Sequence, residues 1–255
     1  MKIAKTLSSY QLKIVALIFM LIDHIHTYLH VGPGWISAIT RFVAPLFLFF
    51  IVEGFMHTSN RKRYFLRTLG FAMLTLMGNV AINIVFHNVD YLTGEMDFYS
   101  LIAGNNILLT YAIFLLILKC LEEFKEQANF FRFGWLIVGI LLSMMTIPFC
   151  EGALQLLPLL YIFYFCYGNK RRIIFGVLIY SFMWLVKAIS NYLAYGMGVG
   201  LLPTLSYNCE FMMSLVCLAI ISYDGTKGKK GVLGKWSFYV IYPVHIWLLR
   251  ILSLL

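Results

Sequence analysis

The sequence is poor in charge. Of its 255 residues, 12% are charged and 61% are hydrophobic, and Asp and Glu together number only 11. Soluble domains carry about 25% charged and about 45–50% apolar residues. This shortage of charge excludes an ordinary soluble domain and predicts a protein that lies in a lipid bilayer.

Paired cysteine motifs are also missing. The chain has five cysteines, and none of them forms a Cys-x-x-Cys pair. Such pairs are typical of structural zinc sites and of thiol redox centres. We therefore interpret most of the cysteines as apolar packing residues, with a disulfide between Cys150 and Cys209 as a weaker alternative. We expect no bound cofactor and assign no residue as a metal ligand in the favoured interpretation.

Long apolar runs fill almost the whole chain. A helix that crosses the hydrocarbon core needs about 20 apolar residues. The sequence therefore predicts an all-α polytopic membrane protein, in which residues 1–255 form one transmembrane domain of about nine helices around a polar cavity. The predicted spans lie near 12–30, 35–57, 64–86, 105–121, 133–149, 152–168, 172–194, 204–222 and 236–254. The fifth and sixth runs are short and form a candidate hairpin that does not cross fully.

Basic residues occur in every second connection between these runs. The intervening segments 31–34, 87–104, 150–152 and 195–203 contain no Lys or Arg. Because short basic loops stay in the cytoplasm, we expect a multi-pass protein of the cell membrane with its amino terminus in the cytoplasm and its carboxy terminus outside. The basic connections hold Lys2, Lys5 and Lys13; Arg61, Lys62, Arg63 and Arg67; Lys119, Lys125 and Arg132; Lys170, Arg171 and Arg172; and Lys227, Lys229, Lys230 and Lys235.

The net charge of +9 thus reflects membrane topology and not a nucleic-acid partner. Membrane lipid is the expected surrounding. Clusters of cations at the cytoplasmic surface are also suited to phosphate groups. We single out two such clusters as candidate anion sites: Arg61, Lys62 and Arg63; and Lys170, Arg171 and Arg172.

Several ionisable residues interrupt the apolar runs. Charges inside a bilayer are costly and usually functional. With a rise of about 1.5 Å per residue, six polar residues fall about 9–10 Å below the outer surface. They are Asp23, His24, Arg41, Asn79, Lys187 and Glu210. His245 falls near the midplane, and Glu53 and His57 lie near the cytoplasmic end of their run.

The outer layer of polar residues has two interpretations. Asp23 with Arg41, and Lys187 with Glu210, can be structural ion pairs that join neighbouring spans. Alternatively, the layer lines a wet cavity and forms a reaction site, because unpaired charges at this depth are prohibitively costly. The sequence alone leaves both open.

Four segments carry a resemblance to a known family. The stretches KIVALIFMLIDHI, RFVAPLFLFFIVEGFMHTSNRKRYFLRTLGFA, NNILLTYAIF and WSFYVIYPVHIWLL resemble the TraX family of membrane proteins. That family includes the enzyme that acetylates conjugative pilin at its amino terminus. The chain is similar, more distantly, to transmembrane acyltransferases of the acyltransferase-3 type. Where the family pattern predicts Asp-Tyr-Gly before the sixth span, this chain has Cys150-Glu151-Gly152-Ala153.

The resemblance implies acyl transfer from cytoplasmic acyl-CoA, with acetyl-CoA as co-substrate, to an acceptor peptide or glycan. The buried polar residues fit this chemistry. We interpret His24 as the base that deprotonates the acceptor, with Asp23 as the group that orients it. Arg41 is the first candidate to stabilise the oxyanion, and His245 is the second. The basic clusters would hold the donor phosphates, and Glu53 and His57 would guide the donor inward.

Two other functions stay open at this stage. Asp23, His26 and His30 share one face of a helix, and a carboxylate with two imidazoles suits zinc or another transition metal. A metal carrier is therefore one alternative. A proton-coupled transporter, with Asp23, Arg41, Lys187 and Glu210 as its relay, is the other.

Overall fold

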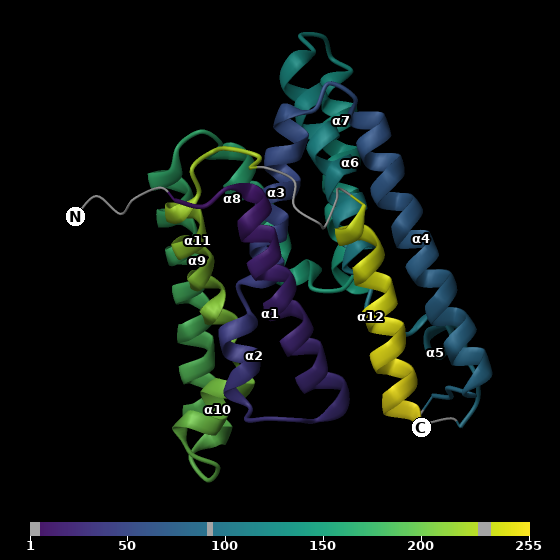
Figure 1. Ribbon diagram of the computed structural model, residues 1–255. Helices are drawn as coiled ribbons and strands as arrows, with labels where there is room; N and C mark the ends of the chain where they lie inside the picture. Colours follow the sequence, from purple (N-terminus) through teal and green to yellow (C-terminus); the bar gives the residue numbers. More distant parts are fainter. Residues whose placement is uncertain (1–5, 91–93, 229–235) are drawn as a thin grey trace. The chain divides into compact units, whose positions relative to one another are not determined.

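The protein is helical throughout. The computed structural model describes residues 6–90, 94–228 and 236–255, and within them every regular element is a helix (Figure 1). The all-α prediction is confirmed. Lys2, Lys5, Lys229, Lys230 and Lys235, which supported the predicted orientation, lie outside the described residues.

The chain divides into two compact units. Unit 1 combines Met1–Val52 with Pro158–Val232, and unit 2 combines Glu53–Leu157 with Leu233–Leu255. Two helices, α3 (Val43–His57) and α8 (Ala153–Phe165), contribute residues to both units.

Unit 1 begins with a firmly capped helix. The Ser8 side chain accepts from the Gln11 N–H while the Gln11 side chain accepts from the Ser8 N–H, a capping box that starts α1 (Ser9–Leu29). The helix ends where His30 adopts a left-handed conformation with φ 54°. The remaining helices of the unit are α2 (Trp35–Thr40), α9 (Lys170–Asn191), the π-helical η1 (Tyr192–Gly196), α10 (Leu201–Tyr207), the 3-10 helix η2 (Glu210–Leu215) and α11 (Val216–Ser222).

An aromatic cluster forms part of the core of unit 1. Phe49 on α3 packs edge-on against Phe163 on α8, with ring centroids 5.6 Å apart, and against Tyr223 at 5.9 Å. All three residues are buried. Edge-to-face pairs of this kind add about 0.5–1.5 kcal/mol to the free energy gained by burying the rings.

Unit 2 is built on three long helices, and two of them begin at an Asn cap. Asn60 caps α4 (Arg61–Val85), and Asn106 caps α6 (Ile107–Glu126). α6 packs against both α4 and α7 (Arg132–Phe149), as Figure 1 shows for α6 and α7. The short α5 (Phe98–Ile102) and the last helix, α12 (Ser237–Leu254), both pack on α4.

Six helical segments are long and apolar enough to cross a membrane, or up to seven if the bent pair α10 and η2–α11, which turns by 66°, is one span. These counts refer to the described ranges. The six are Ser9–Leu29, Trp35–His57, Arg61–Val85, Arg132–Phe149, Lys170–Gly196 and Ser237–Leu254. Two predicted spans are not among these segments. The α6 helix carries Lys119, Glu122 and Glu123 near its end, and α8 has only 13 residues. Nine crossings around a polar cavity stay a prediction.

The contact between α4 and α12 depends on a glycine. A Cβ added at Gly78 would lie 2.2 Å from ring atoms of Trp247, whereas one added at Gly70, two turns earlier on α4, would meet nothing within 4 Å. The missing side chain at Gly78 therefore lets the Trp247 ring lie directly against the α4 backbone.

We expect Gly78→Ala to lower the unfolding free energy in mixed micelles by about 1–3 kcal/mol, because the indole must leave its site. Gly70→Ala is the matched control. It should leave stability unchanged or raise it by up to about 1 kcal/mol through helix propensity. Equal effects of the two substitutions would contradict the packing of Trp247 on α4.

Candidate functional site

Unit 1 holds the polar residues of α1 and of the junction between α2 and α3. Asp23 Oδ1 accepts a hydrogen bond from Thr40 Oγ1 at 2.6 Å, which ties α1 to the end of α2. Arg41 Nε donates to the Cys209 sulfur at 3.1 Å, and its charge also interacts with Glu210 and Asp23. Arg41 thus lies among two carboxylates and a thiol that come from two separate parts of the chain, Asp23 on α1 and the adjacent Cys209 and Glu210.

The predicted structural ion pairs are replaced by other contacts. Among the residues that the structure describes, no ion pair within 4 Å joins Asp23 to Arg41 or Lys187 to Glu210. Asp23 bonds to a hydroxyl instead, and the exposed Lys187 ammonium lies 4.5 Å from the ring centroid of Trp184. A cation over an indole face is a favourable arrangement at low dielectric.

His24 lies beside Asp23 in sequence but not on the same side of the helix. Consecutive residues of an α-helix point about 100° apart. Asp23 is turned toward Thr40, and the half-buried His24 ring lies edge-on to Tyr28 with centroids 6.3 Å apart. These contacts give no support to the predicted role of Asp23 as the group that orients His24.

The break between α10 and η2 positions Cys209. Asn191 Nδ2 donates to Asn208 Oδ1 at 2.8 Å, and Asn208 Nδ2 donates to the Thr204 carbonyl at 3.0 Å. These bonds satisfy polar groups where the helix is interrupted. Interrupted helices at membrane depth occur where backbone is buried in protein or lines a cavity. Cys209, at the break, is fully buried.

The metal-binding alternative has no geometric support. His26 Nδ1 is bonded to the Val31 carbonyl at 2.8 Å, and His30 has left the helical face because of its left-handed backbone. In the described ranges no group of three His, Cys, Asp or Glu residues is close enough to hold a metal ion. The helix ends at Leu29, so His30 does not share the helical face of Asp23 and His26 that the sequence predicts.

Unit 2 contains a second polar cluster, centred on Glu151 in the turn between α7 and α8. Glu151 Oε1 accepts from Asn105 Nδ2 at 2.8 Å, and Oε2 lies 3.4 Å from the Tyr242 hydroxyl. The same hydroxyl accepts from the Ile107 N–H at 3.0 Å, and Thr110 Oγ1 donates to the Glu151 carbonyl at 2.8 Å. The carboxylate therefore lies at the start of α6, where unpaired N–H groups favour negative charge.

The cluster extends along α4 and α12. Arg250 donates to the Ala103 carbonyl at 2.6 Å and to Asn83 Oδ1 at 2.5 Å. Asn79 is fully buried, and its Nδ2 donates to the Asn105 carbonyl at 3.2 Å. Gly104 fits between them, because a Cβ there would lie 2.3 Å from Arg250 and 2.7 Å from Asn79.

His245 lies on α12 one turn after Tyr242. The side chain is buried, and its Nδ1 lies 2.7 Å from the Ile241 carbonyl. A carbonyl can only accept, so Nδ1 carries the hydrogen, and the lone pair of the neutral ring is on Nε2. The Tyr242 ring meets the imidazole edge-on at 5.7 Å.

Four residues of this cluster are not among the predicted site residues: Glu151, Asn105, Tyr242 and Arg250. Glu151 was assigned to an outer loop, although it is the only carboxylate between the basic cluster before α7 and the one after α8. Arg250 is the one cation inside the last apolar run. Both signals are visible in the sequence, but neither identifies the partners.

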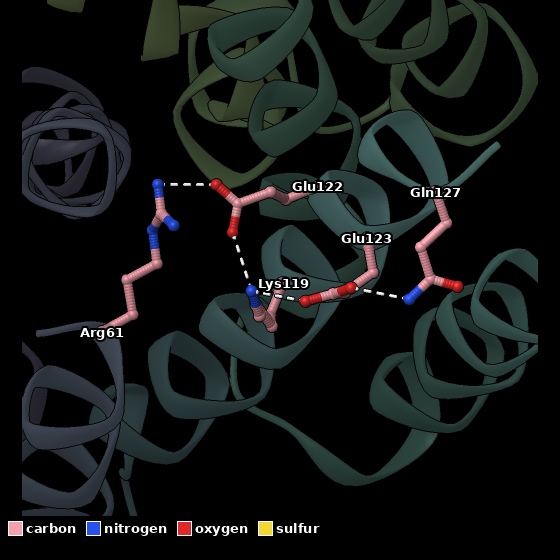
Figure 2. Close-up of polar contacts among 5 residues, drawn as sticks. All are labelled: Arg61, Lys119, Glu122, Glu123 and Gln127. Atoms are coloured by element: carbon pink, nitrogen blue, oxygen red, sulfur yellow. Dashed lines mark hydrogen bonds and ion pairs between the residues drawn. The ribbon is translucent and has the colours of Figure 1, made fainter. Parts of the chain in front are cut away.

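The cations of the two predicted anion sites differ in whether they have partners inside the protein. Arg61 pairs with Glu122 at 2.6 Å, and Lys119 bridges Glu122 at 3.0 Å and Glu123 at 2.6 Å, as Figure 2 shows. The hydrogen bond from Lys119 lowers the pKa of the Glu123 carboxyl, and a second bond from Gln127 acts in the same direction. Arg61 is therefore part of an ion-pair network.

The other cations of these clusters are more accessible. Lys62, Arg63, Arg171 and Arg172 are exposed, whereas Lys170 donates to the Tyr223 carbonyl. Glu53 and His57 form an i, i+4 pair at 3.8 Å on α3.

The predicted outer layer draws on both units. Asp23, His24, Arg41, Lys187 and Glu210 belong to unit 1, and Asn79 belongs to unit 2. A common layer of these residues stays a prediction.

A helical chain with several candidate spans and charged side chains held by partners inside apolar runs defines a multi-pass membrane protein. The family model of the TraX protein matches residues 8–253, so the chain belongs to the TraX family. A probable fimbrial assembly protein FimC, serogroup H1, from Dichelobacter nodosus is 26% identical over 248 residues, which cover 95% of this chain and 94% of that protein. No solved structure matches the chain. The predicted family is confirmed.

We expect Arg61→Gln to lower the unfolding free energy by roughly 1–3 kcal/mol, because the side chain of Glu122 is only 11% exposed and loses a charged partner. Lys62→Gln is the control, since this exposed neighbour should change stability by no more than about 0.5 kcal/mol. Unfolding in mixed micelles measures both. A destabilised Lys62 variant beside an unaffected Arg61 variant would contradict the network.

Proposed function

We propose that this protein is an integral membrane acyltransferase that moves an acetyl group from cytoplasmic acetyl-CoA to an amine or hydroxyl of a secreted or membrane-associated acceptor. Membership of the TraX family, which is associated with pilin acetylation, supports the reaction class. The name of the Dichelobacter relative, a probable fimbrial assembly protein, favours a fimbrial or pilin-like peptide over a surface glycan as the acceptor.

The observation that carries the proposal is the buried His245 with Nδ1 bonded to its own helix. Acetyl transfer needs a base within a site that excludes water, because thioesters are also open to hydrolysis. Nε2 of the neutral ring can take a proton from the acceptor. The acceptor nitrogen then bonds to the thioester carbon, the carbon–sulfur bond breaks, and the proton passes to the departing thiolate. The products are the acetylated acceptor and free CoA.

His24 and Arg41 are the alternative site, within unit 1. The sequence favoured His24 as the base and Arg41 as the oxyanion donor. Arg41 has the planar donors and the partly polar surroundings that such a role needs. For the base, the contacts of His245 support a defined tautomer, whereas the contacts of Asp23 do not support its partnership with His24. We therefore propose His245 as the base.

For the donor, we propose the exposed cations of the two cytoplasmic clusters as phosphate ligands. Lys62, Arg63, Arg171 and Arg172 can reach a ligand without breaking an internal pair. Arg61 and Lys170 have internal partners, and Glu53 and His57 pair with each other. Lys187, Glu210 and Asn79 remain candidates for acceptor contacts at the predicted outer layer.

We also propose nine crossings with the amino terminus in the cytoplasm. This orientation requires α8 to return the chain to the basic cluster Lys170–Arg172. Thirteen residues of helix span about 20 Å, whereas the hydrocarbon core is about 30 Å thick. The turn that carries Glu151 would then lie about 10 Å inside the outer boundary.

A reporter that is active only in the cytoplasm tests this orientation. Fused after Leu255 it should be silent, and fused after Asn169, next to the basic cluster, it should be active. A cytoplasmic signal from the carboxy-terminal fusion would show that one proposed segment does not cross. The fusion after Asn169 serves as the positive control for expression.

The transferase itself is tested with purified full-length protein, labelled acetyl-CoA and host membrane extract. Label should move to a proteinaceous acceptor. His245→Ala should lower turnover by about 10²–10⁴-fold, the usual contribution of a positioned base. His24→Ala, at matched expression and monodispersity, should lower it less.

Two further results of the same assay bear on the proposal. Replacement of Lys62 and Arg63 together by Gln should raise the KM for acetyl-CoA, whereas Lys227→Gln, an exposed cation outside both clusters, should leave it unchanged. If His24→Ala loses more turnover than His245→Ala, the result would favour His24, in unit 1, as the base. Absence of transfer to any extract would reject the acyltransferase proposal.

A further inference from the structure

Tyr242 is held from two directions within unit 2. Its hydroxyl accepts from the Ile107 N–H at 3.0 Å and lies 3.4 Å from Glu151 Oε2, so the Tyr proton is directed to the carboxylate. Glu151 is itself fixed by Asn105 through Oε1 and by Thr110 through its carbonyl oxygen. The phenol therefore has one favoured orientation.

The Tyr242 ring in turn lies against the imidazole of His245. The two residues are three apart on α12, on the same face of the helix. Their rings meet edge-on, with centroids 5.7 Å apart and planes at 72°. Because Nδ1 is bonded to the Ile241 carbonyl at 2.7 Å, a contact at the ring edge limits the remaining rotation of the imidazole.

We propose that Glu151 and Tyr242 are positioning residues for His245: the carboxylate holds the phenol, and the phenol holds the imidazole so that Nε2 keeps one direction. The inference deepens the proposed function and rests on it for its kinetic consequences. Glu151 acts only through Tyr242 and needs no contact with donor or acceptor.

A carboxylate suits this position better than a neutral acceptor. Hydrogen bonds to a charged acceptor are about twice as strong as neutral ones. At the start of α6 the Asn106 N–H is also directed at Glu151, and this donor offsets part of the cost of keeping the charge away from water.

A purely structural role is the competing explanation, because the same contacts hold the start of α6 against α12 and the α7–α8 turn. A structural role predicts lower stability and a smaller active fraction. A positioning role predicts slower turnover by protein that remains folded, and it predicts that the loss depends on His245.

The test is a double-mutant cycle on the full-length protein. Glu151→Gln and Tyr242→Phe should each lower kcat about 10- to 100-fold, the range for residues that orient metal-bound imidazoles. The KM for acetyl-CoA should stay within about twofold, as expected when only the reacting group is displaced. In the His245→Ala background neither change should lower the rate further, since residues that act as a unit are not additive.

Glu126→Gln and Tyr207→Phe are the matched controls, because both residues are exposed and lie outside the cluster. They should retain wild-type kcat. A wild-type kcat for both test variants would overturn the inference, and so would an undiminished effect of either in the His245→Ala background. A fall in rate that is explained entirely by a smaller active fraction of the protein would also overturn the inference.

Nitrogen NMR of labelled histidine gives a measurement that does not depend on transfer. The His245 signal, assigned by its loss in His245→Ala, should show a single Nδ1–H tautomer in the wild type and a mixture in both test variants. An unchanged tautomer in both variants would contradict positioning even if their kinetics were impaired. If the wild type transfers no acetyl group but the tautomer responds as expected, the proposed function fails and the positioning stands.

Discussion

The cost of placing charge in an apolar medium governs this structure. The half-buried Glu151 and Arg250 both have partners that offset part of that cost. Glu151 takes donors from a side-chain amide and the backbone of α6, and Arg250 takes a carbonyl and an Asn oxygen. Because these partners come from α4, the segment before α6, the α7–α8 turn and α12, satisfying the polar groups also fixes how the helices of unit 2 meet.

In unit 1 the half-buried Asp23 and the exposed Arg41 have neutral hydrogen-bond partners. Asp23 accepts from a threonine hydroxyl and Arg41 donates to a cysteine sulfur, although opposite charges are available on both sides. An ion pair away from water recovers its desolvation cost only with good geometry. Hydroxyl and thiol partners bring less charge into the same space, and the electrostatic attraction between Arg41, Glu210 and Asp23 acts without direct contact.

Sequence patterns predicted the helices well and the partners poorly. Each apolar run became a helix or a bent pair, because hydrophobicity over 20 residues is a local property. Asn79 and His245, which interrupt predicted apolar runs, are buried in the structure. Glu151 was missed because its partners, Asn105 and Tyr242, lie far from it in the sequence, and the partner of Arg61, Glu122, lies 61 positions later. Long-range pairing of this kind is set by packing, which one sequence does not reveal.

The ion-pair network around Arg61 and the polar cluster around Glu151 both belong to unit 2. The proposed donor site needs cations that are free to bind phosphate. Arg61 is already paired with Glu122, and its guanidinium lies 4.8 Å from the ring centroid of Phe55. Exposed neighbours such as Lys62 and Arg63 carry no such commitment. The α6 helix links the two regions, since it begins beside Glu151 and ends in the Lys119–Glu123 pairs. Because both ends of α6 have side-chain partners, the Ile107 N–H at its start is held where it can donate to the Tyr242 hydroxyl.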